Sequence, residues 1–212
     1  MLPLFLHDGG PMIWLILLAG AIALAVFIER VLHCHRAQIN TAEFLNGVRN
    51  VLKRDNVVEA VSICDATPGP VARIVKTAIL NRDKSRERVR EEVEEAGLAE
   101  VPVLEERLNL LATIAQIAPL LGLLGTILGF INVFRRLQSD GAYAHLFGGE
   151  HSLSAGIWEA LICAAAGIAV AIPVHAAYNY LVSRINKIVL DMERTASEIV
   201  NIVTENGNDK AS

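Results

Sequence analysis

The chain has 212 residues, of which 53% are hydrophobic and 20% are charged, and its formal net charge is −4. An apolar share above the roughly 45–50% of soluble domains indicates a membrane protein. The small negative charge gives no basis for nucleic-acid binding, and three cysteines without CxxC spacing predict neither a disulfide framework nor a zinc site.

The first element is an uncharged stretch, residues 9–28, which is long enough to cross a bilayer as a helix. A cleaved signal peptide is the competing interpretation, because Ala21-Ile22-Ala23 resembles a cleavage site. Residues 1–8 contain no Lys or Arg, however, whereas a signal peptide begins with a basic region. We therefore predict a retained transmembrane helix over 9–28, preceded by an extracytoplasmic segment over 1–8.

Residues 29–107 follow as a nearly neutral insert whose apolar residues recur at helical spacing. Three amphipathic helices are expected, at residues 44–52, 56–64 and 71–79. The Thr67-Pro68-Gly69-Pro70 segment separates the second of these helices from the third. Ser85 is a candidate N-cap for a fourth helix.

The insert carries no phosphate-binding loop, zinc motif or nucleophile elbow. The cluster His33-Cys34-His35 lies beside Arg30 and Arg36, which favours a basic flank at a membrane surface over a metal site. A run of four glutamates between positions 91 and 95 is typical of a solvated helix face rather than of a site for a basic partner. The sequence therefore predicts no enzyme activity, no cofactor and no metal ion.

A second uncharged stretch, from Asn109 to Phe134, predicts a transmembrane helix over residues 108–134. This stretch contains small residues four positions apart, a spacing that lets another helix approach closely on one face. The residues expected to mediate this packing, or to line the interior of a ring, are Pro119, Gly122, Gly125 and Gly129. Thr126 shares this face, where it can pack or can be presented to a partner or a path.

A loop over residues 135–158 leads to the third uncharged stretch, which predicts a transmembrane helix over 159–183 with Glu159 at its head. The small or bend-forming residues expected at its packing face are Ala160, Ala164, Gly167, Ala171 and Pro173. Apolar residues keep helical spacing beyond Arg184, so a helix from Glu159 to Thr204 is expected, about 70 Å long at about 1.5 Å per residue.

Basic residues near the helix ends predict the orientation, because cytoplasmic flanks carry an excess of Lys and Arg. Arg30, Arg107 and Arg184 mark one side, and Arg135 with Arg136 opposes them. The predicted fold class is an all-α integral membrane protein with three transmembrane helices. A helical cytoplasmic domain is expected from the insert and from long extensions of the second and third helices, and residues 184–212 form the cytoplasmic tail.

Two segments of the chain resemble the ExbB/TolQ/MotA family of proton-driven stator proteins. The first is Ala118-Pro119-Leu120-Leu121-Gly122-Leu123-Leu124-Gly125-Thr126, in the second predicted span. The second comprises Gly156-Ile157-Trp158-Glu159-Ala160-Leu161, then Gly167-Ile168-Ala169-Val170-Ala171-Ile172-Pro173 and Tyr178-Asn179. Three crossings rather than four favour the ExbB/TolQ branch.

The resemblance implies a homo-oligomer, most simply a pentamer, around single-pass partner helices of the ExbD/TolR type. Each partner carries a membrane-embedded aspartate, and proton flow past it drives work in the cell envelope, such as TonB-dependent uptake or Tol-Pal function. The resemblance further implies a multi-pass protein of the bacterial inner membrane, surrounded by lipid, with a TonB-like protein as a further partner.

The resemblance also implies that Thr126 and Glu159 belong to the proton path. One position departs from the family pattern: the residue five after Glu159 is Ala164, where the family often has a second threonine. The third helix therefore offers a less polar path than is usual for the family.

A non-conducting membrane oligomer that scaffolds an envelope complex is the alternative function. A carboxylate at the bilayer centre costs roughly 2.5–3.5 kcal/mol and usually marks function, whereas Glu159 at a helix N-terminus near the interface would be stable without one. A threonine hydroxyl such as that of Thr126 can bond a carbonyl one turn back, and His175 is either a proton relay or a packed histidine. The sequence leaves open ExbB against TolQ, and proton against sodium.

Overall fold

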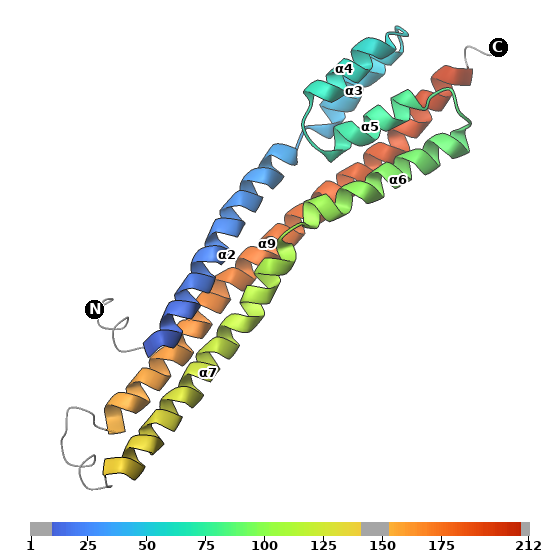
Figure 1. Cartoon of the computed structure of the whole chain (residues 1–212). Coiled ribbons are helices and arrows are strands. Elements are labelled where there is room, and N and C mark those ends of the chain that lie inside the picture. The colour runs from blue at the N-terminus through green and yellow to red at the C-terminus, as the bar shows by residue number, and fades with distance from the viewer. Residues whose placement is uncertain (1–9, 141–152, 209–212) are drawn as a thin grey trace. The chain divides into compact units, whose positions relative to one another are not determined.

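The computed structural model describes residues 10–140 and 153–208, and within these residues every regular element is an α-helix (Figure 1). The helices are α2 (Gly10–Ala37), α3 (Thr41–Leu52), α4 (Val57–Ala66), α5 (Pro70–Leu80), α6 (Arg86–Glu105), α7 (Leu108–Asp140) and α9 (Leu153–Asn208). Three helices, found in α2, α7 and α9, are long and apolar enough to cross a membrane. The predicted fold class, all-α with three transmembrane helices, is confirmed.

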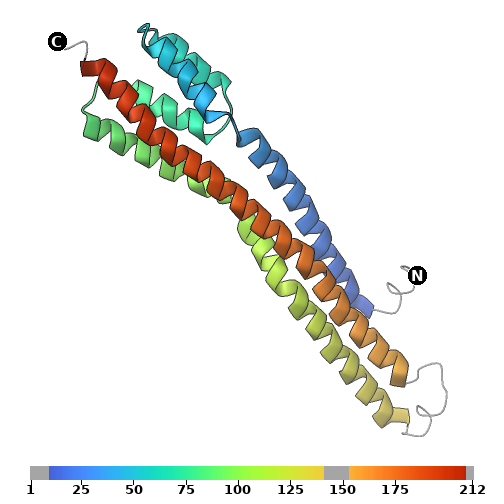
Figure 2. The same ribbon diagram turned by 180° about the vertical axis from the view of Figure 1, so that it is seen from behind.

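The chain divides into two compact units. Of the described residues, the first unit holds 10–28, 107–140 and 153–180, and we call it the membrane unit. Its three helices run alongside one another (Figure 2), and large apolar side chains such as Leu120 and Ile172 remain more than half exposed on their outer faces. Such faces suit a lipid environment, because a soluble domain rarely leaves a continuous apolar surface uncovered.

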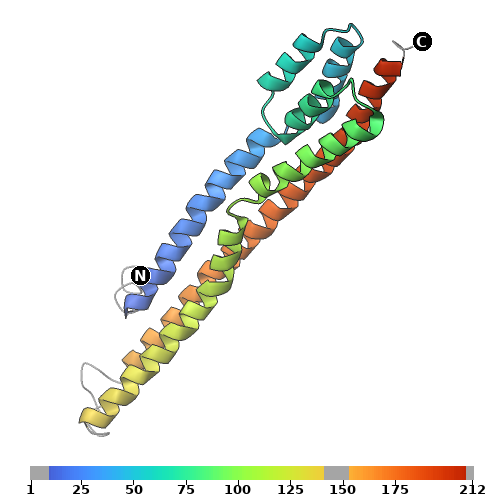
Figure 3. The ribbon, with the colours of Figure 1, turned by 45° about the vertical axis from the view of Figure 1, so that its right-hand side comes forward.

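The second unit holds residues 29–106 and the part of α9 from Leu181 onward, and we call it the insert unit. Helices α3 to α6 pack in chain order, each on the next (Figure 3). Its core is formed by apolar side chains with at most 1% exposure, among them Val48, Ile74, Val75, Val93 and Ile199. Each of these side chains contributes about 1.5–3 kcal/mol relative to an exposed position.

The ends of the insert helices follow the local sequence. Asn56 caps α4 by accepting from the backbone N–H of Glu59 at 3.3 Å, and Ser85 caps α6 through the N–H of Arg88 at 3.5 Å. Gly69 precedes α5 with φ +115°, and a Cβ there would lie 2.8 Å from the Ala37 carbonyl oxygen, so only glycine fits. The helices predicted from periodicity and the cap predicted at Ser85 are confirmed.

The helices extend beyond the spans that were predicted from uncharged runs. Helix α2 continues to Ala37, α7 continues to Asp140 past the predicted end at 134, and α9 begins at Leu153, before the predicted start at 159. Charge marks where a helix leaves the bilayer, but it does not end the helix. Residues 1–9, 141–152 and 209–212, which include most of the predicted loop, lie outside the described part of the chain.

One expected continuity is absent. The predicted extension of the second membrane helix is a separate helix, because α6 ends at Glu105 and α7 begins at Leu108. Between them Glu106 is extended (φ −50°, ψ 136°) and Arg107 has φ +63°. A left-handed backbone costs a residue other than glycine roughly 1–2 kcal/mol, so this break is an energetically unfavourable local feature.

Candidate functional site

Glycines bring α7 and α9 into backbone contact inside the membrane unit. A Cβ placed on Gly122 would lie 2.9 Å from the Cys163 carbonyl oxygen, and one on Gly125 would lie 2.8 Å from Cys163 Cβ. A Cβ on Gly167 would lie 2.6 Å from the Ala118 carbonyl oxygen. These separations are too short for any side chain, so the small-residue spacing fixes the distance between the two helices.

The predicted packing residues occupy different places in this arrangement. Those at the α7–α9 contact within one chain are Gly122, Gly125, Gly129, Ala160, Ala164 and Gly167. Ala171 is buried and Pro119 is half-buried, whereas Pro173 is exposed on the outer face of α9. The glycines of α7 are thus used for packing inside one chain, and a role for any of these residues inside a ring remains a prediction.

Thr126 is half-buried beside this contact, and its hydroxyl donates a hydrogen bond to the Leu123 carbonyl oxygen at 2.5 Å. The hydroxyl proton is therefore used within the helix. A hydroxyl has one proton and two lone pairs, so the oxygen of Thr126 keeps the capacity to accept a hydrogen bond from another group. The side chain is suited to accepting from a protonated acid or from a water molecule.

Glu159 is also half-buried. The contact between α7 and α9 shows which residues of α7 lie beside it along the helix pair. A Cβ on Gly129 would lie 3.0 Å from Ala160 Cβ, so the residue next to Glu159 lies opposite Gly129. Thr126 comes three residues before Gly129, a rise of about 4.5 Å along a helix. Thr126 and Glu159 therefore lie within about one helical turn of each other along the pair.

The two residues nevertheless face different sides of the pair. Helix α2 covers one side, since Met12 lies against Gly125 and Val170 lies against Gly20. Val170 follows Glu159 by eleven residues, about three turns, so both point to the side that α2 covers. Thr126 is one residue, about 100°, round α7 from Gly125, so it does not share the direction in which Gly125 faces Met12. One chain alone does not bring the two predicted path residues onto one face.

The other polar candidates do not form a site. His175 is exposed, and its ring lies beside that of Tyr178 with centroids 6.3 Å apart. His33 and His35 are exposed while Cys34 is buried, because consecutive helical residues point in different directions. Burial raises the pKa of the Cys34 thiol, which keeps the thiol neutral. No group of three or more His, Cys, Asp or Glu in residues 10–140 and 153–208 is placed to hold a metal ion.

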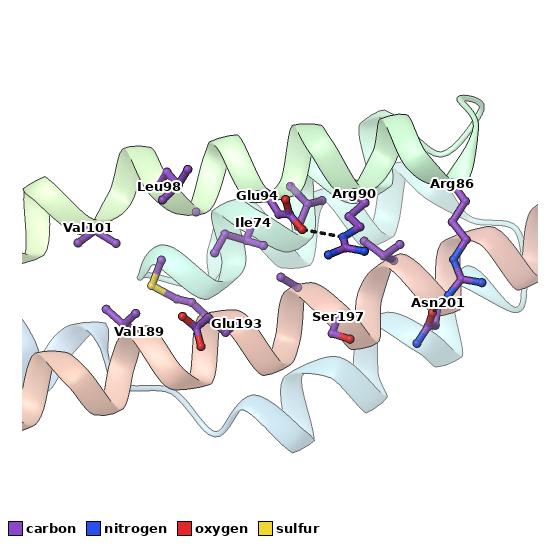
Figure 4. A pocket seen from close by; sticks show the side chains of 15 residues that line it. Ile74, Arg86, Arg90, Glu94, Leu98, Val101, Val189, Glu193, Ser197 and Asn201 are labelled. Carbon is purple, nitrogen blue, oxygen red and sulfur yellow. Dashed lines mark hydrogen bonds and ion pairs between the residues drawn. The ribbon is translucent and has the colours of Figure 1, made fainter.

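A groove of about 590 Å³ lies between α6 and α9 in the insert unit (Figure 4). Its floor is apolar, with Ile74, Val93 and Met192. Its rim carries two arginines that donate hydrogen bonds within the unit. Arg90 donates to the Glu94 carboxylate at 2.7 Å, and Arg86 of α6 donates to the side-chain oxygen of Asn201 of α9 at 2.6 Å. Ser197 and the carboxylates of Glu94 and Glu193 also line the groove.

The feature that sequence reasoning missed is Arg30, whose side chain is only 4% exposed. Its Nη2 donates to Glu106 Oε2 at 3.1 Å, while its Nε is buried and has no hydrogen-bond partner. Burying a charge with incomplete pairing costs several kcal/mol. The sequence predicted a solvated basic flank here, and no local signal could show that residues far along the chain enclose Arg30.

Comparison with known proteins matches residues 66–194 to the MotA/TolQ/ExbB proton channel family. An ExbB homolog of Methanothermobacter thermautotrophicus is 27% identical over 85% of this chain and 62% of its own length. The TolQ protein of the Tol-Pal system of Haemophilus influenzae is 38% identical over 53% of this chain and 47% of its own length. The biopolymer transport protein ExbB of Neisseria gonorrhoeae is 26% identical over 93% of this chain and 94% of its own length.

The family match covers α7 up to Asp140 and the part of α9 that packs against it, so it includes both motif segments and both predicted path residues. The three relatives described above are named ExbB or TolQ. This chain therefore belongs to the MotA/TolQ/ExbB proton channel family, in its ExbB/TolQ branch.

Proposed function

We propose that this chain is a ring-forming subunit of a motor in the bacterial inner membrane that is driven by the proton-motive force. In this proposal several copies surround single-pass partner helices of the ExbD/TolR type, and proton flow is coupled to work in the envelope, such as TonB-dependent uptake or Tol-Pal function. The observation that carries the proposal is the match of residues 66–194, which contain the glycine-fixed α7–α9 pair, to a proton channel family.

The first step concerns the partner's carboxyl group. A carboxyl inside an apolar ring is desolvated, and desolvation raises its pKa until it can exchange protons near neutral pH. Thr126 suits the protonated acid, because its own proton is held by Leu123 and its oxygen accepts. Thr126 also points to the side of the α7–α9 pair that α2 does not cover, so a partner helix can reach it within the proposed ring.

The second step concerns Glu159, which we place at the outer mouth of the path. A carboxylate near the first turns of a membrane helix raises the local concentration of cations. Because Glu159 and Thr126 face different sides of the α7–α9 pair, a single chain does not bring the two residues together, and the proposed path needs several copies of the chain. This arrangement makes the path a property of the ring and not of a single chain.

The orientation is proposed from the basic flanks. Arg30, Arg107 and Arg184 follow or precede the uncharged runs on one side, and we place that side, with residues 29–107 and 184–212, in the cytoplasm. A cysteine introduced at position 86 should then be protected from a membrane-impermeant maleimide in whole cells, and one at position 143 should react. The reverse labelling pattern would contradict this orientation.

Assembly is the experiment that tests the proposed ring. The full chain is co-expressed with a single-pass protein that carries one membrane aspartate, and the complex is examined by native mass spectrometry in mild detergent. We expect one closed ring size with the partner retained, because the proposed path requires several copies of the chain around a partner helix. A stable monomer that never retains the partner would exclude the ring and the motor together.

A further inference from the structure

Within a single chain His175 joins no site, although it lies well inside the membrane unit. It falls in the uncharged stretch 160–183 of α9, nine residues and about 14 Å before Arg184. Its side chain is exposed, and within residues 10–140 and 153–208 its imidazole has no hydrogen-bond or ion-pair partner. An ionisable side chain at this depth is costly in lipid, so it normally faces water or protein and marks function.

His175 points away from α2. A Cβ placed on Gly20 would lie 3.2 Å from Val170 Cγ1. The rings of Tyr180 and Phe27 lie edge to face, with centroids 6.4 Å apart. Val170 and Tyr180 are each five residues from His175, which is about 140° round the helix. The imidazole therefore lies on a face of α9 that α2 does not cover.

Polar side chains are distributed unevenly over the three membrane helices. From Pro11 to Ile28, α2 carries no side chain more polar than that of Trp14. Helix α7 carries an exposed amide at Gln116, and α9 carries one at Asn179, four residues after His175 and on the same face. The open faces of α2 thus suit lipid, whereas these exposed polar groups on α7 and α9 need water or protein beside them.

Gln116 lies near the level of His175 along the helix pair. A Cβ on Gly122 would lie 3.2 Å from Gly167 Cα, so these two glycines are opposite each other. Gln116 precedes Gly122 by six residues, and His175 follows Gly167 by eight. Because α7 and α9 run antiparallel, the two levels differ by two residues, about 3 Å. Gln116 is also nine residues, about 180°, round α7 from Gly125, the glycine that faces α2.

We propose that His175 carries protons along a hydrated face of α9, between the level of Thr126 and Arg184. The imidazole accepts a proton from water on the Thr126 side and gives it up to water on the Arg184 side, so only N–H and O–H bonds change and the side chain returns to its starting state. Histidine suits this step because it readily gains and loses a proton near neutral pH. The inference rests on the proposed function and extends its path beyond Thr126.

Thiol labelling tests whether this face is hydrated, without any measurement of flux. The complex with the single-pass partner is placed in liposomes, with the native cysteines replaced by alanine and a membrane-impermeant trimethylammonium methanethiosulfonate on both sides. His175→Cys should react on the order of ten-fold faster than Ala176→Cys, because the reacting thiolate forms in water and not in lipid. Ala176 is also exposed and lies one residue nearer to Arg184, so depth alone would make it the more reactive position. Equal reactivity at both positions, whether high or low, would overturn the inference.

Proton flux through the same complex tests whether the imidazole itself carries protons. His175→Asn keeps a polar side chain but cannot bind a proton, so flux should fall by about a hundred-fold, the low end of what a positioned acid–base group contributes. His33→Asn makes the same change at an exposed histidine outside the predicted span and should leave flux unchanged.

The outcomes separate this inference from the proposed function. If the parent conducts and the His175→Asn complex, with the ring mass of the parent, conducts equally, His175 is no proton carrier and the proposed function stands. If the parent complex shows no flux, the proposed function fails and this inference fails with it.

Discussion

Thr126 carries a hydroxyl whose proton is already bound to the Leu123 carbonyl, so Thr126→Val removes only an acceptor from the proposed path. We expect the variant to assemble normally, because threonine and valine have nearly the same volume. Proton uptake by liposomes that hold the complex should fall by on the order of ten-fold, as expected when one hydrogen bond of about 1.4 kcal/mol is lost.

A matched control is available on the same helix. Thr113 also donates to a carbonyl one turn back, that of Asn109 at 2.7 Å, but it lies more than three turns before Thr126. Thr113→Val should therefore leave uptake unchanged. Glu159→Gln preserves volume and removes the charge at the proposed mouth, so it should lower uptake as well. Parent-like uptake in both Thr126→Val and Glu159→Gln would make these residues packing groups.

Cys64 gives a prediction that depends on pH in the insert unit. Burial raises the pKa of its thiol from 9.0 to about 11, assisted by the neighbouring Asp65 carboxylate and opposed by Lys76. The thiol ionises at a lower pH in the unfolded chain than in the folded chain. The stability that comes from burying the neutral thiol is therefore fully present below pH 9 and is lost as the pH rises to about 11. With the other cysteines replaced by alanine, the rate of alkylation of the folded chain should titrate near pH 11, and that of urea-unfolded chain near pH 9. Coincident titrations would contradict the burial of Cys64.

The sequence singles out some of the candidate residues but not others. Thr126 and Glu159 could be selected because they are polar residues in or at the edge of apolar runs with recognisable small-residue neighbours. Arg30 could not, because its side chain is buried and pairs with Glu106, which is distant in the sequence. The side on which Thr126 and Glu159 point likewise depends on where α2 packs, and no local pattern contains that information.

At the scale of the elements, the α7–α9 contact depends on glycines, because even one added Cβ at Gly167 would collide with the facing helix. Gly167→Ala would place a methyl group 2.6 Å from the Ala118 carbonyl oxygen, and backbone cannot move away as a flexible side chain can. We expect destabilisation of about 1–3 kcal/mol, the usual cost of overpacking. The measurement is thermal unfolding of the complex in detergent.

Gly47→Ala is the control for that prediction. Gly47 lies inside α3 and nothing lies within 4 Å of its missing Cβ, so alanine should stabilise the helix by roughly 1 kcal/mol. The two substitutions make the same chemical change and are expected to shift the melting temperature in opposite directions. A melting temperature for Gly167→Ala equal to or above that of the parent would show that α7 and α9 do not pack through this contact.

The helices themselves were largely predictable, and the junctions were not. Periodicity and the N-cap at Ser85 predict α3 to α6, because amphipathic helices bury one face and need a side chain at the first turn. The end of α6 at Glu105 carries no such signal, since the following residues favour a helix. The predicted spans end at charged residues, but a charge does not end a helix, and α7 continues past Arg135 to Asp140.

At the scale of the whole molecule, membership of a proton channel family is established, and conduction by this chain is what remains to be measured. A ring that conducts and a ring that only scaffolds an envelope complex would give the same native mass. They differ in whether protons cross the membrane when a potential is imposed, and in whether that flow depends on the partner's carboxyl group.

The most direct measurement is therefore proton flux into liposomes that hold the purified complex of this chain with its single-pass partner, under an imposed inside-negative potential. The account predicts flux above that of empty liposomes, and predicts its loss when the partner's membrane aspartate is replaced by asparagine in a complex that still assembles. Flux no greater than that of empty liposomes, from a complex shown to be an intact ring with its partner, would contradict the account and leave the structural scaffold as the function.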